Sequence, residues 1–137
     1  MAEPGSSVLH VEVVAADHSV WSGDVTSITA RTTEGDIGIL PGHSPVLAVL
    51  VPSGVEIVEQ GGGRQVVAVD GGFISVAQNR VSILSEYAAM SSEIDAGRAR
   101  SELEELLGRV GADEDDPELQ AAIARARARV KAAERAR

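Results

Sequence analysis

The hydrophobic pattern of this sequence changes once along the chain, at Ser91-Ser92. Before this point, apolar and polar residues alternate in short runs, as at Leu9, Val11 and Val13, and turn residues separate the runs. After it, apolar residues recur at the three- and four-residue steps of a helix. A parallel α/β sheet is disfavoured because no helical pattern lies between the strand-like runs. We expect a β domain over residues 1–88 and a helical hairpin over residues 89–137.

The first part is predicted to be an all-β sandwich or flattened barrel. Gly61-Gly62-Gly63 and Gln78-Asn79 each predict a hairpin, and Asp70-Gly71-Gly72 predicts a turn or bulge. Short strands at this spacing are typical of sandwiches and barrels. The strand-like runs are 8–14, 25–32, 54–60, 64–69, 73–77 and 80–86.

The second part is predicted to be two antiparallel helices. Ser92 followed by Asp95 has the capping-box pattern that opens a helix, and Gly108 or Gly111 would end it. An acidic turn then leads to Asp116-Pro117-Glu118, which predicts the start of the second helix. The apolar residues of that helix form a narrow seam for one partner helix: Leu119, Ile123, Ala126, Val130 and Ala133.

This seam is rich in alanine, and its larger side chains are Leu119, Ile123 and Val130. Burying a large aliphatic side chain stabilises by about 1.5–3 kcal/mol. The total is comparable to the few kcal/mol that separate two populated conformers. We therefore predict that the helical pair can undock from the β domain.

Charge is unevenly distributed along the chain. Residues 123–137 carry six basic groups and one acid, a net charge of +5, so the rest of the chain carries −14 of the total −9. An acidic body disfavours nucleic-acid binding. Since no apolar run approaches the roughly 20 residues that span a bilayer, membrane association would require a partner.

No constellation of catalytic or metal-binding residues is visible. The three histidines, His10, His18 and His43, lie in different segments without metal-ligand spacing, and cysteine is absent. A phosphate-binding loop ending in Gly-Lys-Ser/Thr is also absent. We predict that the chain has no catalytic activity by itself and no metal site.

Residues 34–47 are unusually rich in turn-forming residues, with three glycines and two prolines around an apolar centre. This density of glycine and proline predicts an irregular loop of defined shape rather than a helix or strand. Loops on a rigid scaffold often form docking surfaces. On the residues alone, a plain tight turn is the favoured interpretation of Asp36 and His43.

Four motifs resemble the ε subunit of bacterial F-type ATP synthases, and along the chain they follow the family's order. Trp21-Ser22-Gly23 is similar to the family's opening hairpin, and Gly71-Gly72-Phe73 to its central turn. Residues 34–45 resemble its central loop. Ile94-Asp95-Ala96-Gly97-Arg98-Ala99 is similar to the start of its first helix.

The resemblance implies a sandwich of about ten short strands followed by a helical hairpin. It implies a non-catalytic central-stalk subunit that binds the γ subunit and the membrane rotor c-ring. The hairpin would extend toward the catalytic α/β head and restrain ATP hydrolysis. The chain would lie peripherally at the cytoplasmic face of the bacterial plasma membrane, through the complex.

The resemblance also implies roles for particular residues. Asp36 and His43 would contact arginine, glutamine or acidic groups on the loops of the rotor ring. The glycines of the same segment, Gly35, Gly38 and Gly42, would shape the approach.

Two interpretations of the Asp95–Arg98 segment stay open. Spaced three apart, these residues form a common local ion pair. Some members of the family bind ATP, as a regulatory ligand, through this segment and arginines of the second helix, here Arg125 and Arg129. Ala89 stands where those ATP-binding members carry an acid.

The second helix places like charges four residues apart, at Arg125 and Arg129 and again at Arg127 and Lys131. Such pairs repel, and Glu134 is the one acid nearby, so an acidic partner is expected rather than only a solvated face. The resemblance implies an acidic segment of the catalytic β subunits, contacted by Arg125, Arg127 and Arg129.

A rival from another class is a free-standing β-sandwich module that binds carbohydrate or peptide and dimerises through its helical tail. The low aromatic count argues against a sugar-binding platform, because only Trp21, Phe73 and Tyr87 are present.

Overall fold

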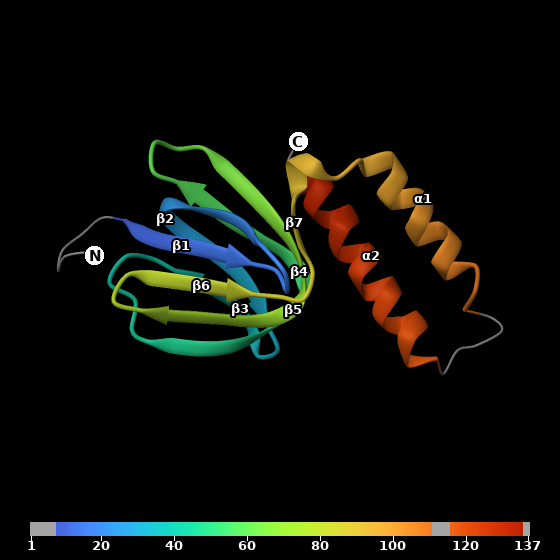
Figure 1. The fold of residues 1–137 in the computed structure, drawn as a ribbon, viewed down its shortest axis with the longest axis horizontal. Coiled ribbons are helices and arrows are strands. Elements are labelled where there is room, and N and C mark those ends of the chain that lie inside the picture. The colour runs from blue at the N-terminus through green and yellow to red at the C-terminus, as the bar shows by residue number, and fades with distance from the viewer. Residues whose placement is uncertain (1–7, 111–115, 136–137) are drawn as a thin grey trace.

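The computed structural model describes residues 8–110 and 116–135, which form a β domain beside two antiparallel helices (Figure 1). The β domain contains β1 (Leu9–Val14), β2 (Ser19–Thr32), β3 (Gly35–Ile39), β4 (Val46–Glu59), β5 (Arg64–Ala77), β6 (Arg80–Leu84) and β7 (Ala88–Met90). A short 3-10 turn, η1 (Ser91–Glu93), leads to α1 (Ala96–Leu107) and α2 (Pro117–Arg135).

The sheet closes on itself as a flattened barrel. Its strand order is β1-β6-β5-β4-β2-β3, and β1 also pairs with β2. The β1–β6 pair is parallel, while β1 runs antiparallel to β2. Alternate residues point into an aliphatic core, and Leu9, Val11 and Val13 are fully buried as their pattern predicts. The predicted sandwich or flattened barrel with a helical hairpin is therefore confirmed.

The expected count of about ten strands is wrong, because three strands are long. Within the described residues there are seven strands, and β2, β4 and β5 each have 14 residues. The runs 64–69 and 73–77 belong to one strand, β5, which bends at Gly71 and Gly72. These glycines have φ of +83° and +102°. A Cβ on Gly72 would overlap the backbone carbonyl of Leu84, so this bend requires glycine.

The prediction of an irregular loop over residues 34–47 is wrong in its first half. Residues Gly35–Ile39 form β3, which pairs antiparallel with β2 from Ile28 to Thr32. This pairing supplies backbone hydrogen bonds that local propensity does not reveal. The irregular segment lies between Ile39 and Val46.

The helix ends follow the predicted caps with one correction. Asp95, not Ser92, caps α1, because its Oδ1 accepts a hydrogen bond from the backbone N–H of Arg98 at 3.0 Å. Gly108 is the C-cap of α1. The alternative Gly111 and most of the acidic turn lie outside the described residues. Asp116 accepts from the N–H of Glu118 at 2.9 Å and caps α2.

The prediction that α2 packs against a single partner helix is wrong, because its buried surface is wider than the predicted seam. Figure 1 shows α2 between the sheet and α1, so α2 packs on both. Ala128 and Ala132 are buried in addition to most of the predicted seam, whereas Val130 is partly exposed. Facing Ala132, Val66 and Ala68 are also buried. No helix among the described residues is long and apolar enough to cross a membrane.

Gly72→Ala should unfold the β domain far more readily than an alanine at a glycine of similar φ in open space. Gly61 has φ +101° and nothing within 4 Å of an added Cβ, so Gly61→Ala is the matched control. We expect losses in unfolding free energy of about 1–2 kcal/mol for Gly61→Ala, and of about 4 kcal/mol or more for Gly72→Ala. Urea unfolding measures both, and equal losses would contradict the steric argument.

Candidate functional site

The contact between α2 and the sheet is made by small residues. A Cβ on Gly54 of β4 would lie 3.1 Å from Val66 Cγ1 and 3.7 Å from Ala132 Cβ. The helix therefore lies close to the strand backbone at this point. Because alanine and glycine bury little apolar area, this contact is close but weak in free energy.

Three ion pairs join α2 to the sheet and to α1. Arg125 Nε lies 2.9 Å from Asp70 Oδ2, and the Asp70 side chain is only 16% exposed. Between the helices, Arg129 Nη2 lies 3.1 Å from Glu102 Oε2, and Arg100 Nη2 lies 3.0 Å from Glu134 Oε1. The acids that compensate Arg125 and Arg129 thus come from β5 and α1. The expectation that only Glu134 could relieve their repulsion is wrong, because the pairing depends on tertiary contacts.

A shallow pocket of about 300 Å³ lies where α1 begins beside α2. It brings together three of the four residues expected at a nucleotide site, namely Asp95, Arg98 and Arg129. The fourth, Arg125, pairs with Asp70 outside it. The other lining residues are Tyr87, Ala89, Glu93, Ile94, Ala99 and Glu102.

Glu102 forms ion pairs with both arginines of this pocket. Its carboxylate lies 3.1 Å from Arg129 Nη2 and 3.5 Å from Arg98 Nε. Asp95 contacts the backbone amide of Arg98 rather than its guanidinium. The Arg129 guanidinium also lies 5.6 Å from the centre of the Tyr87 ring, a cation–π contact, and its buried Nε has no hydrogen-bond partner among the described residues.

The three arginines expected to contact a catalytic β subunit do not form one exposed surface. Arg125 and Arg129 face Asp70 and Glu102. Arg127 is exposed and makes no hydrogen bond or ion pair with other described residues. In this docked arrangement, only Arg127 of the three points away from the protein's own acids.

The residues expected at the rotor ring lie along β3 and the loop after it. Asp36, at the start of β3, binds Arg31 Nε at 2.9 Å, and this hydrogen bond and charge raise the pKa of Arg31. His43 lies beyond the other end of β3, so the structure separates it from Asp36 by the length of that strand. Added Cβ atoms at Gly35, Gly38 or Gly42 would meet nothing within 4 Å.

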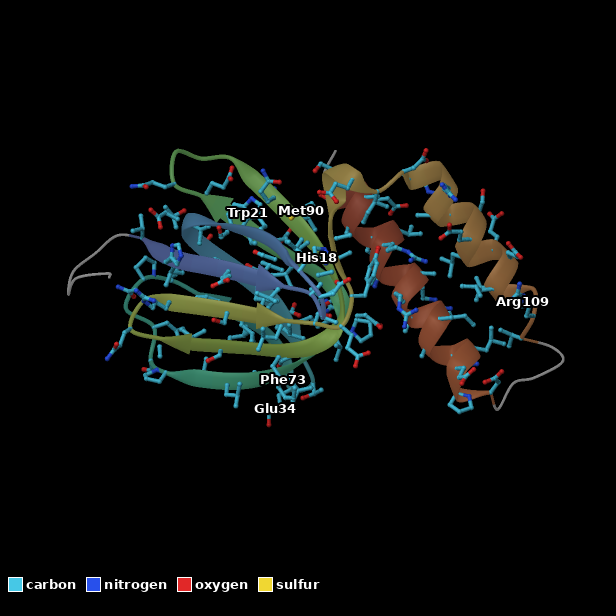
Figure 2. All side chains as sticks on the ribbon, in the orientation of Figure 1. His18, Trp21, Glu34, Phe73, Met90 and Arg109 are labelled. Carbon is cyan, nitrogen blue, oxygen red and sulfur yellow. The ribbon has the colours of Figure 1, made fainter. Side chains whose placement is uncertain are left out.

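An exposed apolar row crosses three strands, and the sequence patterns did not reveal it. Val49 pairs with Phe73, and Phe73 pairs with Leu84, with exposures of 45%, 49% and 48% (Phe73 is labelled in Figure 2). Leu47, 71% exposed, lies two residues before Val49 on the same strand face. One signal was available: residues 46–50 are all apolar, whereas a strand with one buried face should alternate.

No group of three or more acidic or histidine side chains among residues 8–110 and 116–135 could hold a metal ion.

Comparison with known proteins identifies the fold and its relatives. The family described as "ATP synthase, Delta/Epsilon chain, beta-sandwich domain" matches residues 8–91. The ATP synthase epsilon chain of Streptomyces avermitilis is 56% identical over 96 residues, which cover 70% of this chain and 77% of that protein. The ATP synthase epsilon chain of Mycobacterium leprae (strain TN) is 45% identical over 125 residues, covering 90% of this chain and 93% of that protein.

Solved structures agree with these matches. A chain of the Euglena gracilis mitochondrial ATP synthase (OSCP/F1/c-ring) superposes with a TM-score of 0.74 at 27% identity, covering 88% of this chain and 77% of that one. A chain of the Tetrahymena thermophila mitochondrial ATP synthase central stalk and c-ring has a TM-score of 0.53 at 18% identity, covering 91% and 96%. At that identity, the second match supports the fold alone.

Ala132→Leu should push α2 off the sheet without unfolding the β domain. Added volume at this fully buried site, beside Gly54, destabilises docking by about 1–3 kcal/mol. Amide exchange in α2 should accelerate by about 5–150-fold, with exchange in β1 and β6 unchanged. Ala121→Leu, on the exposed side of α2, is the control. Unaltered α2 exchange in Ala132→Leu would show that the contact does not limit undocking.

Proposed function

Since the chain belongs to the ATP synthase epsilon chain family, we propose that it joins the γ subunit to the membrane c-ring in the central stalk of a bacterial F-type ATP synthase. In this role it restrains ATP hydrolysis through its helical hairpin and catalyses nothing itself. The observation that supports the proposal best is that the molecule has two parts with different kinds of surface. A closed sandwich with an exposed apolar row lies beside a helical pair held by small residues and ion pairs. Because the chain belongs to this family, the alternative of a free-standing carbohydrate- or peptide-binding module is rejected.

The apolar row is the proposed docking surface for γ. Val49, Phe73 and Leu84 lie side by side across three hydrogen-bonded strands, and each is about half exposed. A contiguous apolar surface of this kind on a soluble domain marks a protein contact. The rigid sheet beneath it would transmit torque because its closed strand pairing resists deformation.

The segment around β3 is the proposed contact with the c-ring. Gly38 supports this assignment, because neither a positive φ nor internal crowding requires glycine there. A glycine that the fold does not need allows close approach of another backbone. Asp36 and His43 then mark the two ends of the contact, with Gly35 and Gly42 at the flanking turns. The chain would thus lie peripherally at the cytoplasmic face of the plasma membrane.

The helical hairpin is the proposed latch. When docked, it holds Arg125 and Arg129 against Asp70 and Glu102. Undocking would expose these two arginines together with Arg127 to the acidic segment of a catalytic β subunit. Internal and external acids thus compete for the same basic groups, so docking and inhibition of hydrolysis exclude one another.

ATP is a proposed regulatory ligand of the pocket beside α1, and Glu102 is its internal competitor. Three carboxylates, Glu93, Asp95 and Glu102, line this pocket with two guanidiniums, so its net charge disfavours phosphate. Phosphate would have to displace the Glu102 carboxylate from Arg98 and Arg129.

Glu102→Gln should strengthen ATP binding by about tenfold or more, because the neutral amide releases both guanidiniums to phosphate. Titration calorimetry of the full chain measures the change. Glu105→Gln, which removes a carboxylate paired with Arg109 elsewhere on α1, should leave binding unchanged. The absence of heat at millimolar ATP in the wild type and in Glu102→Gln would exclude a nucleotide site.

Phe73→Glu should weaken assembly with γ by about tenfold or more, because a charge would be buried in an apolar contact. Co-purification of the full chain with γ and the c-ring measures this loss. Leu107→Glu, which alters a 40% exposed leucine of α1, is the matched control and should retain γ. Normal recovery of γ with Phe73→Glu would place the γ contact on another face.

A further inference from the structure

The loop after β3 contains a tight turn in which one backbone N–H has no acceptor within the turn itself. His43 N–H donates to the carbonyl of Leu40 at 3.0 Å, Pro41 occupies the second position, and Gly42 has φ +87°. This is the pattern of a type II turn, in which proline and then glycine are favoured. The N–H of Gly42 makes no hydrogen bond within the turn.

Asn79 supplies the acceptor for that donor from another part of the chain. Its side-chain Oδ1 accepts the Gly42 N–H at 2.6 Å. Its backbone carbonyl accepts the N–H of His10 at 2.8 Å. With φ of +50° and +61°, Gln78 and Asn79 form the two-residue turn between β5 and β6, a conformation that asparagine tolerates well. One residue therefore ties together the start of β1, the β5–β6 hairpin and the loop after β3.

The orientation of His43 follows from the same loop. Its Nδ1 lies 2.7 Å from the carbonyl oxygen of Ser44. Because a carbonyl oxygen only accepts, Nδ1 carries the proton in this contact. In the neutral imidazole, Nε2 is then an acceptor, which suits a donating guanidinium or carboxamide on a partner.

We propose that Asn79 is a positioning residue for the contact with the c-ring. It holds the Leu40–His43 turn against the β5–β6 hairpin, so that His43 meets a donor side chain of the ring in a fixed orientation. This inference rests on the proposed role of His43 and assigns a new function to a residue 36 positions away in sequence.

Asn79→Gly tests the proposal, because glycine keeps the positive φ of the hairpin turn while removing the side-chain acceptor. The unfolding free energy should stay close to that of the wild type. Exchange of the Gly42 amide should accelerate by about three- to tenfold, and the affinity of the γ-bound chain for the c-ring should fall by a similar factor. Asn79→Asp retains an acceptor oxygen and should restore both values.

The two measurements separate this inference from the ring contact on which it rests. Unchanged exchange of the Gly42 amide in Asn79→Gly would show that the Asn79 side chain does not hold the Leu40–His43 turn. Faster exchange with unchanged ring affinity would overturn the positioning role. Asp36→Ala/His43→Ala is the companion variant: if it too binds the ring normally, the ring contact itself is wrong. Loss of affinity in Asn79→Gly and in the double variant, with rescue by Asn79→Asp, supports both.

Discussion

The bend of β5 at Gly71-Gly72 is the constraint on which the rest of the molecule depends. Before the bend, Val67 and Val69 fill the barrel core while Val66 and Ala68 face the helices. After it, Phe73 lies on an exposed apolar surface. Since a side chain on Gly72 would overlap the carbonyl of Leu84, only glycine permits the bend. A single strand thereby carries both the surface that binds the hairpin and the surface proposed to bind γ.

Two physical features predict weak docking of α2. Close packing at Gly54 and Ala132 excludes water but buries few methyl groups. Partly exposed ion pairs, such as Arg125–Asp70 with side chains 40% and 16% exposed, each contribute about 1 kcal/mol or less. Undocking of the helical pair, which the alanine-rich seam led us to expect, therefore stays a prediction. The arginines that hold the docked form are the groups that an acidic partner would need.

Features governed by neighbouring residues were predictable. The alternation from Leu9 to Val13, the turn at Gln78-Asn79 and the cap at Asp116 depend on contacts within a few positions. The failures share the opposite property. Strand β3 was missed because its pairing with β2 supplies the hydrogen bonds, and the exposed row was missed because Val49, Phe73 and Leu84 adjoin only through cross-strand register.

The order of residues alone determined a β domain followed by two helices, the family, and the candidate residues on β3 and α2. Hydrophobic period and turn chemistry are local, so they survive without coordinates. Tertiary structure alone decided which acids neutralise Arg125 and Arg129, that α2 has two packing partners, and that Asn79 meets Gly42. Each of these depends on contacts between segments far apart in the sequence, namely α2 on β5, α2 on α1, and the β5–β6 turn on the loop after β3, so no short stretch of sequence reveals it.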